Sequence, residues 1–165
     1  MHRMARLKDG SEIELRPVEP DDGERIVSGF AGLSERSRYE RFFTVVPTLP
    51  RHWLDELVDI DHRDREAIGA VDPQTGDGVG VARYVRLPEH PDEAEFAVTV
   101  TDAWQGRGVG RVLMNELLDA ARANGIARLS GDVLAENEAM LALSRSLGAH
   151  VEPAESAVTH VVIEL

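Results

Sequence analysis

The sequence of 165 residues predicts a single mixed α/β domain. Three observations predict this class: apolar stripes at helical spacing over residues 20–58, alternating apolar and polar residues over 67–101, and a glycine-rich loop that leads from the last of these strands into an amphipathic helix. No change in composition marks a second domain, and a chain of this length buries a substantial core. We expect the domain to span residues 12–165, after an N-terminal extension over residues 1–11.

The first third of the domain predicts one strand and three helices. Ile13 and Leu15 alternate with charged residues, which is typical of a half-buried strand. Helices are predicted to begin near Pro20, after a cap at Ser34, and near Pro50. Their apolar stripes consist of Ile26, Val27, Phe30 and Leu33; Tyr39, Phe42 and Phe43; and Trp53, Leu54, Leu57 and Val58.

The rest of the chain predicts further strands and two helices. The expected strands cover 67–71 and 79–85 around a hairpin loop, then 93–101, 128–134 and 158–165. One helix is expected from Val109 to a C-cap at Asn124-Gly125, and another from an N-cap at Asn137 to Gly148.

Charge and cysteine content exclude several classes of protein. The chain has 30 Asp and Glu against 18 Lys and Arg, a net charge of −12, which argues against nucleic acid as the main partner because phosphate binding needs a basic face. The absence of cysteine excludes a disulfide scaffold, and the six histidines show no metal-ligand spacing. We therefore expect a soluble cytoplasmic domain with no metal, signal peptide or membrane segment.

The most informative segment is Gln105-Gly106-Arg107-Gly108-Val109-Gly110, between a predicted strand and a predicted helix. Glycines let the backbone approach a ligand, and successive N–H groups at a helix N-terminus favour a diphosphate. A dinucleotide-binding fingerprint would need a glycine where Arg111 stands, and a P-loop would need a lysine after the glycines. A glycine-rich connector without a ligand is the remaining alternative.

This loop is similar to the Gln/Arg-x-x-Gly-x-Gly/Ala motif of the GNAT acetyltransferases, and the order of elements resembles that family from about residue 12 to 165. Leu15-Arg16-Pro17, Ser37-Arg38-Tyr39-Glu40-Arg41-Phe42-Phe43 and Ala94-Glu95-Phe96-Ala97 resemble the catalytic domain of bacterial Pat-type protein lysine acetyltransferases. The resemblance implies a twisted, mostly antiparallel sheet with helices on both faces, splayed where acetyl-CoA enters.

The resemblance also implies how acetyl-CoA binds. Val98 and Val100 fall where GNAT proteins pair backbone groups with the pantetheine arm, and an N–H near Val98 would receive the developing charge of the thioester oxygen. The residues that the resemblance assigns to cofactor binding are Val98, Thr99, Val100, Gln105, Gly106, Arg107, Gly108, Val109, Gly110, Arg111 and Asn137. For Arg107, a solvated turn residue is an equal alternative.

The reaction needs a base, because an ammonium must lose a proton before its nitrogen attacks a thioester. Glu95 stands ten residues before Gln105, where Pat-type enzymes carry a glutamate base, so the resemblance implies that Glu95 is catalytic. Glu93 lies on the same face of the predicted strand and is the alternative. A third interpretation is that both carboxylates simply face solvent.

The helix near the C-terminus departs from the commonest GNAT pattern. Asn137 matches a family position that contacts the CoA arm, although a helix N-cap explains it equally well. Seven residues later many GNAT enzymes place a tyrosine that protonates the CoA thiolate, whereas this chain has Ser144. Because a serine hydroxyl is a poor acid, we expect the thiolate to leave unprotonated or to take a proton from water.

The acceptor is expected to be a protein lysine ε-amine, with two alternatives: a small-molecule amine, or no acceptor at all in a non-catalytic CoA-binding sensor. Tyr39, Phe42 and Phe43 are expected in the core, and lining of an acceptor groove is their alternative role. A homodimer is compatible with the resemblance.

Overall fold

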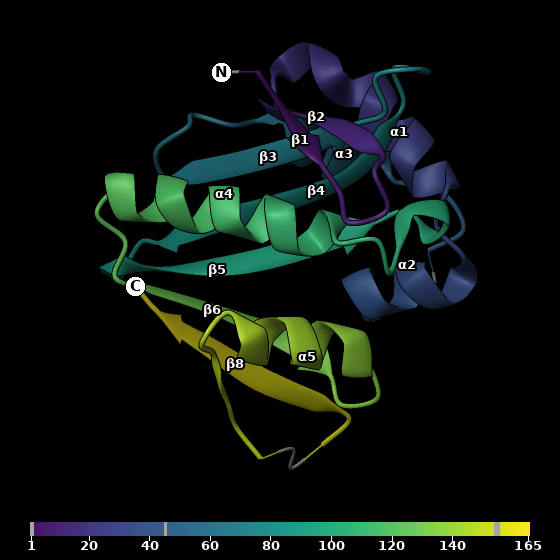
Figure 1. Cartoon of the computed structure of the whole chain (residues 1–165). Coiled ribbons are helices and arrows are strands. Elements are labelled where there is room, and N and C mark those ends of the chain that lie inside the picture. The colour runs from purple at the N-terminus through teal and green to yellow at the C-terminus, as the bar shows by residue number, and fades with distance from the viewer. Residues whose placement is uncertain (1, 45, 154–155) are drawn as a thin grey trace.

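The computed structural model describes residues 2–44, 46–153 and 156–165. In this part of the chain one sheet has eight strands in the order β1-β2-β3-β4-β5-β6-β8-β7 (Figure 1). The strands are β1 (Arg3–Arg6), β2 (Glu12–Pro17), β3 (Arg65–Val71), β4 (Gly78–Leu87), β5 (His90–Val100), β6 (Arg128–Leu134), β7 (His150–Val151) and β8 (Val158–Glu164). Neighbouring strands are antiparallel, except that β5 and β6 run parallel. The mixed α/β class and the mostly antiparallel sheet are confirmed.

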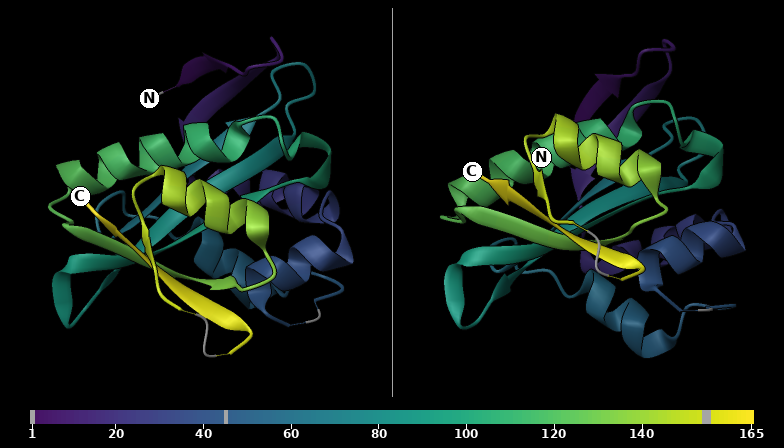
Figure 2. Two further views of the ribbon diagram at one scale, coloured as in Figure 1. Left: turned by 60° about the horizontal axis from the view of Figure 1, so that its bottom comes forward. Right: turned by 90° about the horizontal axis from the view of Figure 1, so that it is seen from below.

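Helices cover both faces of the sheet, as expected. The helices are α1 (Gly23–Ala31), α2 (Glu35–Phe42), α3 (Arg51–Val58), α4 (Val109–Ala123) and α5 (Glu138–Ser146). Helices α1 to α3 lie on one face and α4 and α5 on the other (Figure 2). Ser34 accepts the N–H of Ser37 at 3.1 Å and Asn137 accepts that of Met140 at 3.2 Å, so both predicted N-caps are confirmed.

Each face of the sheet has its own apolar cluster. On the α4 face, Leu113, Met114 and Leu117 are completely buried against the strands. A smaller cluster on the opposite face joins the three N-terminal helices, and in it the rings of Phe42 and Trp53 stack 5.3 Å apart. Replacing a buried leucine such as Leu117 by alanine costs about 2–5 kcal/mol, so α4 is firmly held.

Part of the expected N-terminal extension belongs to the sheet. Residues 3–6 form β1, which pairs with β2 so that Arg3 lies opposite Leu15. This strand was not predicted because two of its four residues are arginines and it has no apolar alternation. As an edge strand it buries little, so its sequence carries no periodic signal.

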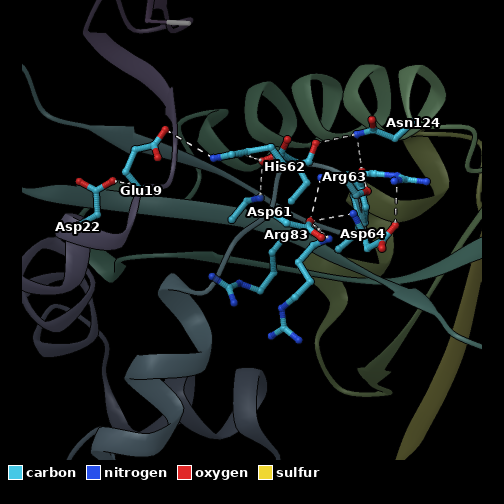
Figure 3. A network of polar contacts seen from close by, with 12 residues as sticks. Glu19, Asp22, Asp61, His62, Arg63, Asp64, Arg83 and Asn124 are labelled. Atoms are coloured by element: carbon cyan, nitrogen blue, oxygen red, sulfur yellow. Dashed lines mark hydrogen bonds and ion pairs between the residues drawn. The ribbon is translucent and has the colours of Figure 1, made fainter.

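A polar network anchors the loop between α3 and β3 (Figure 3). His62 Nδ1 lies 2.9 Å from Glu66 Oε1, and His62 Nε2 lies 3.6 Å from Glu19 Oε1. Asn124, at the end of α4, donates to the hydroxyl of Tyr84 at 2.8 Å. Burial alone would lower the pKa of His62, but the carboxylates of Glu66 and Glu19 outweigh it and raise this pKa above its usual 6.5.

We predict that this histidine makes stability depend on pH. A raised pKa means that its contribution is fully present below about pH 6.5 and is lost as the pH rises through the raised value. His62→Asn keeps a residue that tolerates the left-handed backbone at this position (φ 59°) but removes the charge. Urea unfolding should show wild type more stable than the variant by up to about 1 kcal/mol in acid, with the difference shrinking toward pH 8. A difference independent of pH would contradict the prediction.

Candidate active site

A groove of about 740 Å³ lies where β5 and β6 separate. The two strands share only three Cα pairs, the last of which joins Glu95 to Ser130. Beyond this point β5 stays with β4 and β6 with β8, so the strands diverge (Figure 1). Gly131 lies at the vertex, where a Cβ would stand 3.0 Å from the ring of Phe96 and 3.1 Å from its carbonyl oxygen. The close approach of the two strands therefore favours glycine here.

The divergence exposes one backbone edge of β5. Gln105 Nε2 donates to the carbonyl oxygen of Val100 at 2.9 Å, so this carbonyl faces away from β4. Because the N–H and C=O groups of a strand point to alternate sides with a period of two residues, Val98 presents its backbone to the same open edge. The backbone of Thr99 faces β4, where Val81 is its partner, although Thr99 also lines the groove.

The glycine-rich loop closes one end of the groove with the N-terminus of α4. Gly106 and Gly108 have φ values of 72° and 93°, a left-handed backbone that favours glycine. Gly108 is the N-cap and supplies no side-chain cap, and the first turn contains no acidic residue. The first N–H groups of this 15-residue helix, from Val109 to Arg111, therefore have no capping side chain and point to an anion site. These features fit the pyrophosphate of acetyl-CoA.

The side chain of Arg107 turns away from the groove. Its Nε lies 2.8 Å from Asp9 Oδ2, its Nη2 donates to Ser11 Oγ at 3.0 Å, and its guanidinium lies 3.9 Å above the ring of Trp104. Hydrogen bonds from Ser11, and then the contact with Arg107, lower the pKa of Asp9 to about 2. The side chain thus fixes the loop to the turn between β1 and β2, a role that the sequence did not predict.

The two candidate bases have different surroundings. Glu93 pairs with Arg128 at 2.7 Å and does not line the groove. Glu95 lines the groove at the vertex and is exposed, and among the described residues it has no ion-pair partner. Its carboxylate is therefore the one of the two that is free to accept a proton from a ligand in the groove.

Besides Glu95, two acidic residues line the groove, Glu40 on α2 and Asp132 on β6, and sequence reasoning singled out neither as a candidate base. Asp132 on β6 pairs with His160 on β8, with 3.0 Å between Oδ1 and Nδ1, and both line the groove. Asp132 shares the sheet face of Glu95, because Ser130 pairs with Glu95 and side chains two residues apart point the same way. The only signal in the sequence was the alternation of Ser130 and Asp132, and it did not reveal which strand lies opposite.

At helix α5, Asn137 and Ser144 differ in their position relative to the groove. Asn137 lines the groove while its side chain caps the helix, so both of its expected roles are compatible with its position. Ser144 is completely buried, donates to the carbonyl of Met140 at 2.8 Å, and does not line the groove. Its hydroxyl is therefore not placed to protonate a thiolate.

The expectation that three aromatic residues of α2 lie in the core is wrong for two of them. Phe42 packs against Phe30 and Trp53, as expected. Tyr39 is 43 % exposed and Phe43 is 39 % exposed. Phe43 caps the helix with a left-handed backbone (φ 59°), which turns its ring out of the helical layer to line the groove.

Two further observations concern the described residues as a whole. No cluster of three or more His, Cys, Asp or Glu side chains in them could hold a metal ion. None of their helices is both long enough and apolar enough to cross a membrane.

The splayed sheet beside a glycine-preceded helix N-terminus agrees with the GNAT resemblance of the sequence. The model of the acetyltransferase (GNAT) family matches residues 33–149, and the chain belongs to this family. It is an N-acetyltransferase, which transfers the acetyl group of acetyl-CoA to an amine.

Two relatives and one crystal structure are similar to this chain over most of its length. Acetyltransferase PA5475 of Pseudomonas aeruginosa is 35% identical over 89% of this chain and 80% of its own length. Acetyltransferase Pat of Mycolicibacterium smegmatis is 36% identical over 87% of this chain, which spans only 43% of that longer protein. The crystal structure of the GNAT domain of S. lividans PAT superposes with a TM-score of 0.92 at 31% identity, covering 99% of this chain and 97% of that one.

We predict that Gly108→Glu abolishes acetyl-CoA binding. The substitution places bulk and negative charge where the helix N-terminus favours an anion, and it forces a left-handed backbone on a residue with a Cβ. Gly76→Glu is the matched control, because Gly76 has φ 77°, open space around it, and a place in the hairpin loop before β4. Titration calorimetry with acetyl-CoA should show affinity lost in the first variant and retained in the second. Equal affinities would refute the anion site.

Proposed function

We propose that this chain acetylates a lysine ε-amine of a protein acceptor, with Glu95 as the general base. The observation that carries the proposal is the position of Glu95 at the point where β5 and β6 part, exposed in the groove and without an ion pair among the described residues. A base is useful only where the amine and the thioester meet. At the vertex the open edge of β5 meets the sheet face that carries Glu95 and is covered by α1–α3, and we assign the acceptor to this face, the acceptor side of the groove.

Glu95 would act on the acceptor amine. A lysine ammonium has an ordinary pKa of about 10.4, so at neutral pH it must lose a proton before it becomes a nucleophile. The carboxylate of Glu95 takes that proton directly or through one water. The nitrogen then attacks the carbonyl carbon of the thioester, which supplies the acetyl group when acetyl-CoA is bound.

Backbone N–H groups would bind the thioester oxygen and the pyrophosphate. The N–H of Val98, on the open edge of β5, is suited to donate to the thioester oxygen as negative charge develops there. The amides of residues 106–110 at the start of α4 would hold the pyrophosphate. Because Ser144 is buried away from the groove, the departing thiolate would take its proton from water.

An apolar surface beside the groove supports a protein acceptor. Tyr39 and Phe43 lie one helical turn apart on α2, and both are exposed together with Val85 on β4. Phe43 and Val85 also line the groove. Exposed aromatic groups at the mouth of a site are typical of protein-binding surfaces. The similarity to proteins named Pat supports the same acceptor class.

The base assignment predicts a specific loss in Glu95→Gln. The amide keeps the size of the side chain but cannot accept the proton, so kcat should fall by about 10²–10⁴-fold while affinity for acetyl-CoA stays unchanged. Glu93→Gln and Asp132→Asn serve as matched controls, and both should keep most of the turnover. Undiminished turnover in Glu95→Gln would remove Glu95 as the base, and a large loss in Asp132→Asn would transfer the role to that carboxylate.

The acceptor class has its own test. Intact-mass spectrometry of lysine-containing test proteins, incubated with this protein and acetyl-CoA, should show the mass gain of one or more acetyl groups. The gain should be absent with Glu95→Gln. CoA release with small amines alone, and no modified protein, would favour a small-molecule acceptor instead.

A further inference from the structure

Two arginines on the acceptor side carry positive charge that no carboxylate offsets. Arg83 on β4 is only 8 % exposed, and its one hydrogen bond runs from Nη2 to the carbonyl oxygen of Leu57 at 2.8 Å. Its Nε is buried and has no hydrogen-bond partner in the described part of the chain. Arg41, at the end of α2, lies 4.8 Å from the ring centroid of Phe42. Among the described residues, neither arginine has a carboxylate within ion-pair distance.

This arrangement is costly for a folded protein. An arginine stays protonated at neutral pH, because its ordinary pKa lies above about 12. A buried charge without a counter-ion costs several kcal/mol of desolvation, and buried charges are normally paired. Burial, and then the neighbouring charges of Arg41 and Arg65, depress the pKa of Arg83. The missing negative charge is therefore expected to come from a ligand.

A cavity of about 100 Å³ lies beside these arginines, between α1–α3 and the sheet. Its charged lining residues are Arg16, Asp22, Arg25, Arg41 and Arg83. The single carboxylate, Asp22, is already engaged by Arg16 at 3.1 Å and Arg25 at 2.7 Å. In Figure 3 the guanidinium of Arg83 points toward the helical layer, away from the labelled carboxylates. Arg41 and Arg83 are thus the charges that remain available.

The cavity belongs to the acceptor side of the groove. Arg41, Arg83 and Thr99 line both spaces, whereas the glycine-rich loop does not line the smaller one. On the sheet, Arg83 pairs with Ala97 and Val85 pairs with Glu95, so Arg83 and Glu95 are diagonal neighbours on one face. The backbones of such neighbours lie about 7–8 Å apart, so one ligand can reach both side chains.

We propose that Arg41 and Arg83 form an anion subsite for a carboxylate carried by the amine acceptor. The inference rests on the proposed function, because Glu95 then receives the amine end of the same molecule. In a protein acceptor the carboxylate belongs to an acidic residue near the modified lysine. In a small-molecule acceptor the carboxylate belongs to the same molecule as the amine, as it does in an amino acid. A guanidinium pair suits either source through charge-assisted hydrogen bonds.

Matched acceptors test the subsite. One peptide pair carries a lysine flanked by Glu or by Gln, and one small pair consists of 5-aminopentanoate and pentylamine. Wild type should prefer the carboxylate member by about 10-fold or more in kcat/KM, through KM. Arg41→Gln should bring the ratio close to one without changing acetyl-CoA affinity. The pair that shows the preference identifies the source of the carboxylate.

Two further variants guard against a structural explanation. Arg83→Lys keeps a donor for the carbonyl of Leu57 but loses the guanidinium fork, so it should reduce the preference while the protein stays folded. Arg51→Gln removes the same charge from an exposed position on α3 that lines neither cavity, and it should leave the ratio unchanged. Equal rates with both members of each pair in wild type, or a ratio that survives Arg41→Gln, would overturn the subsite.

Direct binding separates this proposal from the proposed function. Glutarate, a dicarboxylate without an amine, can be titrated into the protein by NMR with no acetyl transfer involved. If no amine is acetylated, the proposed transferase function fails. The binding of glutarate then still shows whether the anion subsite exists. Binding that disappears in Arg41→Gln supports it, and absent or Arg41-independent binding overturns it.

Discussion

The whole active site depends on the short parallel contact between β5 and β6. Three residue pairs hold the strands together, and the chain then forces them apart because each strand has an antiparallel partner on its other side. The separation leaves one edge of β5 without a strand neighbour and opens the groove beside it. Gly131 permits the close contact at the vertex, so the site begins where the contact ends. The same geometry places Glu95 in the groove, at the end of the paired segment.

Charge is distributed unevenly around that vertex. The chain is strongly acidic overall, with a net charge of −12, yet two uncompensated arginines lie on the α2 side of the acceptor face. Asp132 and His160 lie on the β6 side of the same face. Because Glu40 on α2 lines the groove as well, an acceptor would meet charges of both signs on that side, and their arrangement would orient it. Such orientation matters because acyl transfer requires the amine to be held near its target.

Local sequence patterns were enough to predict those elements whose structure depends on residues that are neighbours in the chain. The glycine-rich loop, helix α4 and the caps at Ser34 and Asn137 depend on neighbouring residues, and the structure contains each of them. The isolation of Arg83 and the pairing of Asp132 depend on strand register, which periodicity does not reveal. Tyr39 and Phe43 look like core residues in a helical stripe, but both are exposed, and the left-handed cap of α2 turns Phe43 outward. The roles of Glu95 and of the backbone around Val98 remain predictions, compatible with their positions.

The contact between Arg107 and Asp9 has a consequence for the thermodynamics of ligand binding. A glycine-rich loop loses much conformational freedom when it closes around a ligand, and that loss weakens affinity. Here the contacts of Arg107 with Asp9 and Ser11 already tie the loop to the turn after β1 before any ligand arrives, and Arg107 also lies over the ring of Trp104. Part of the entropy cost is thus met during folding, before a ligand binds to the loop.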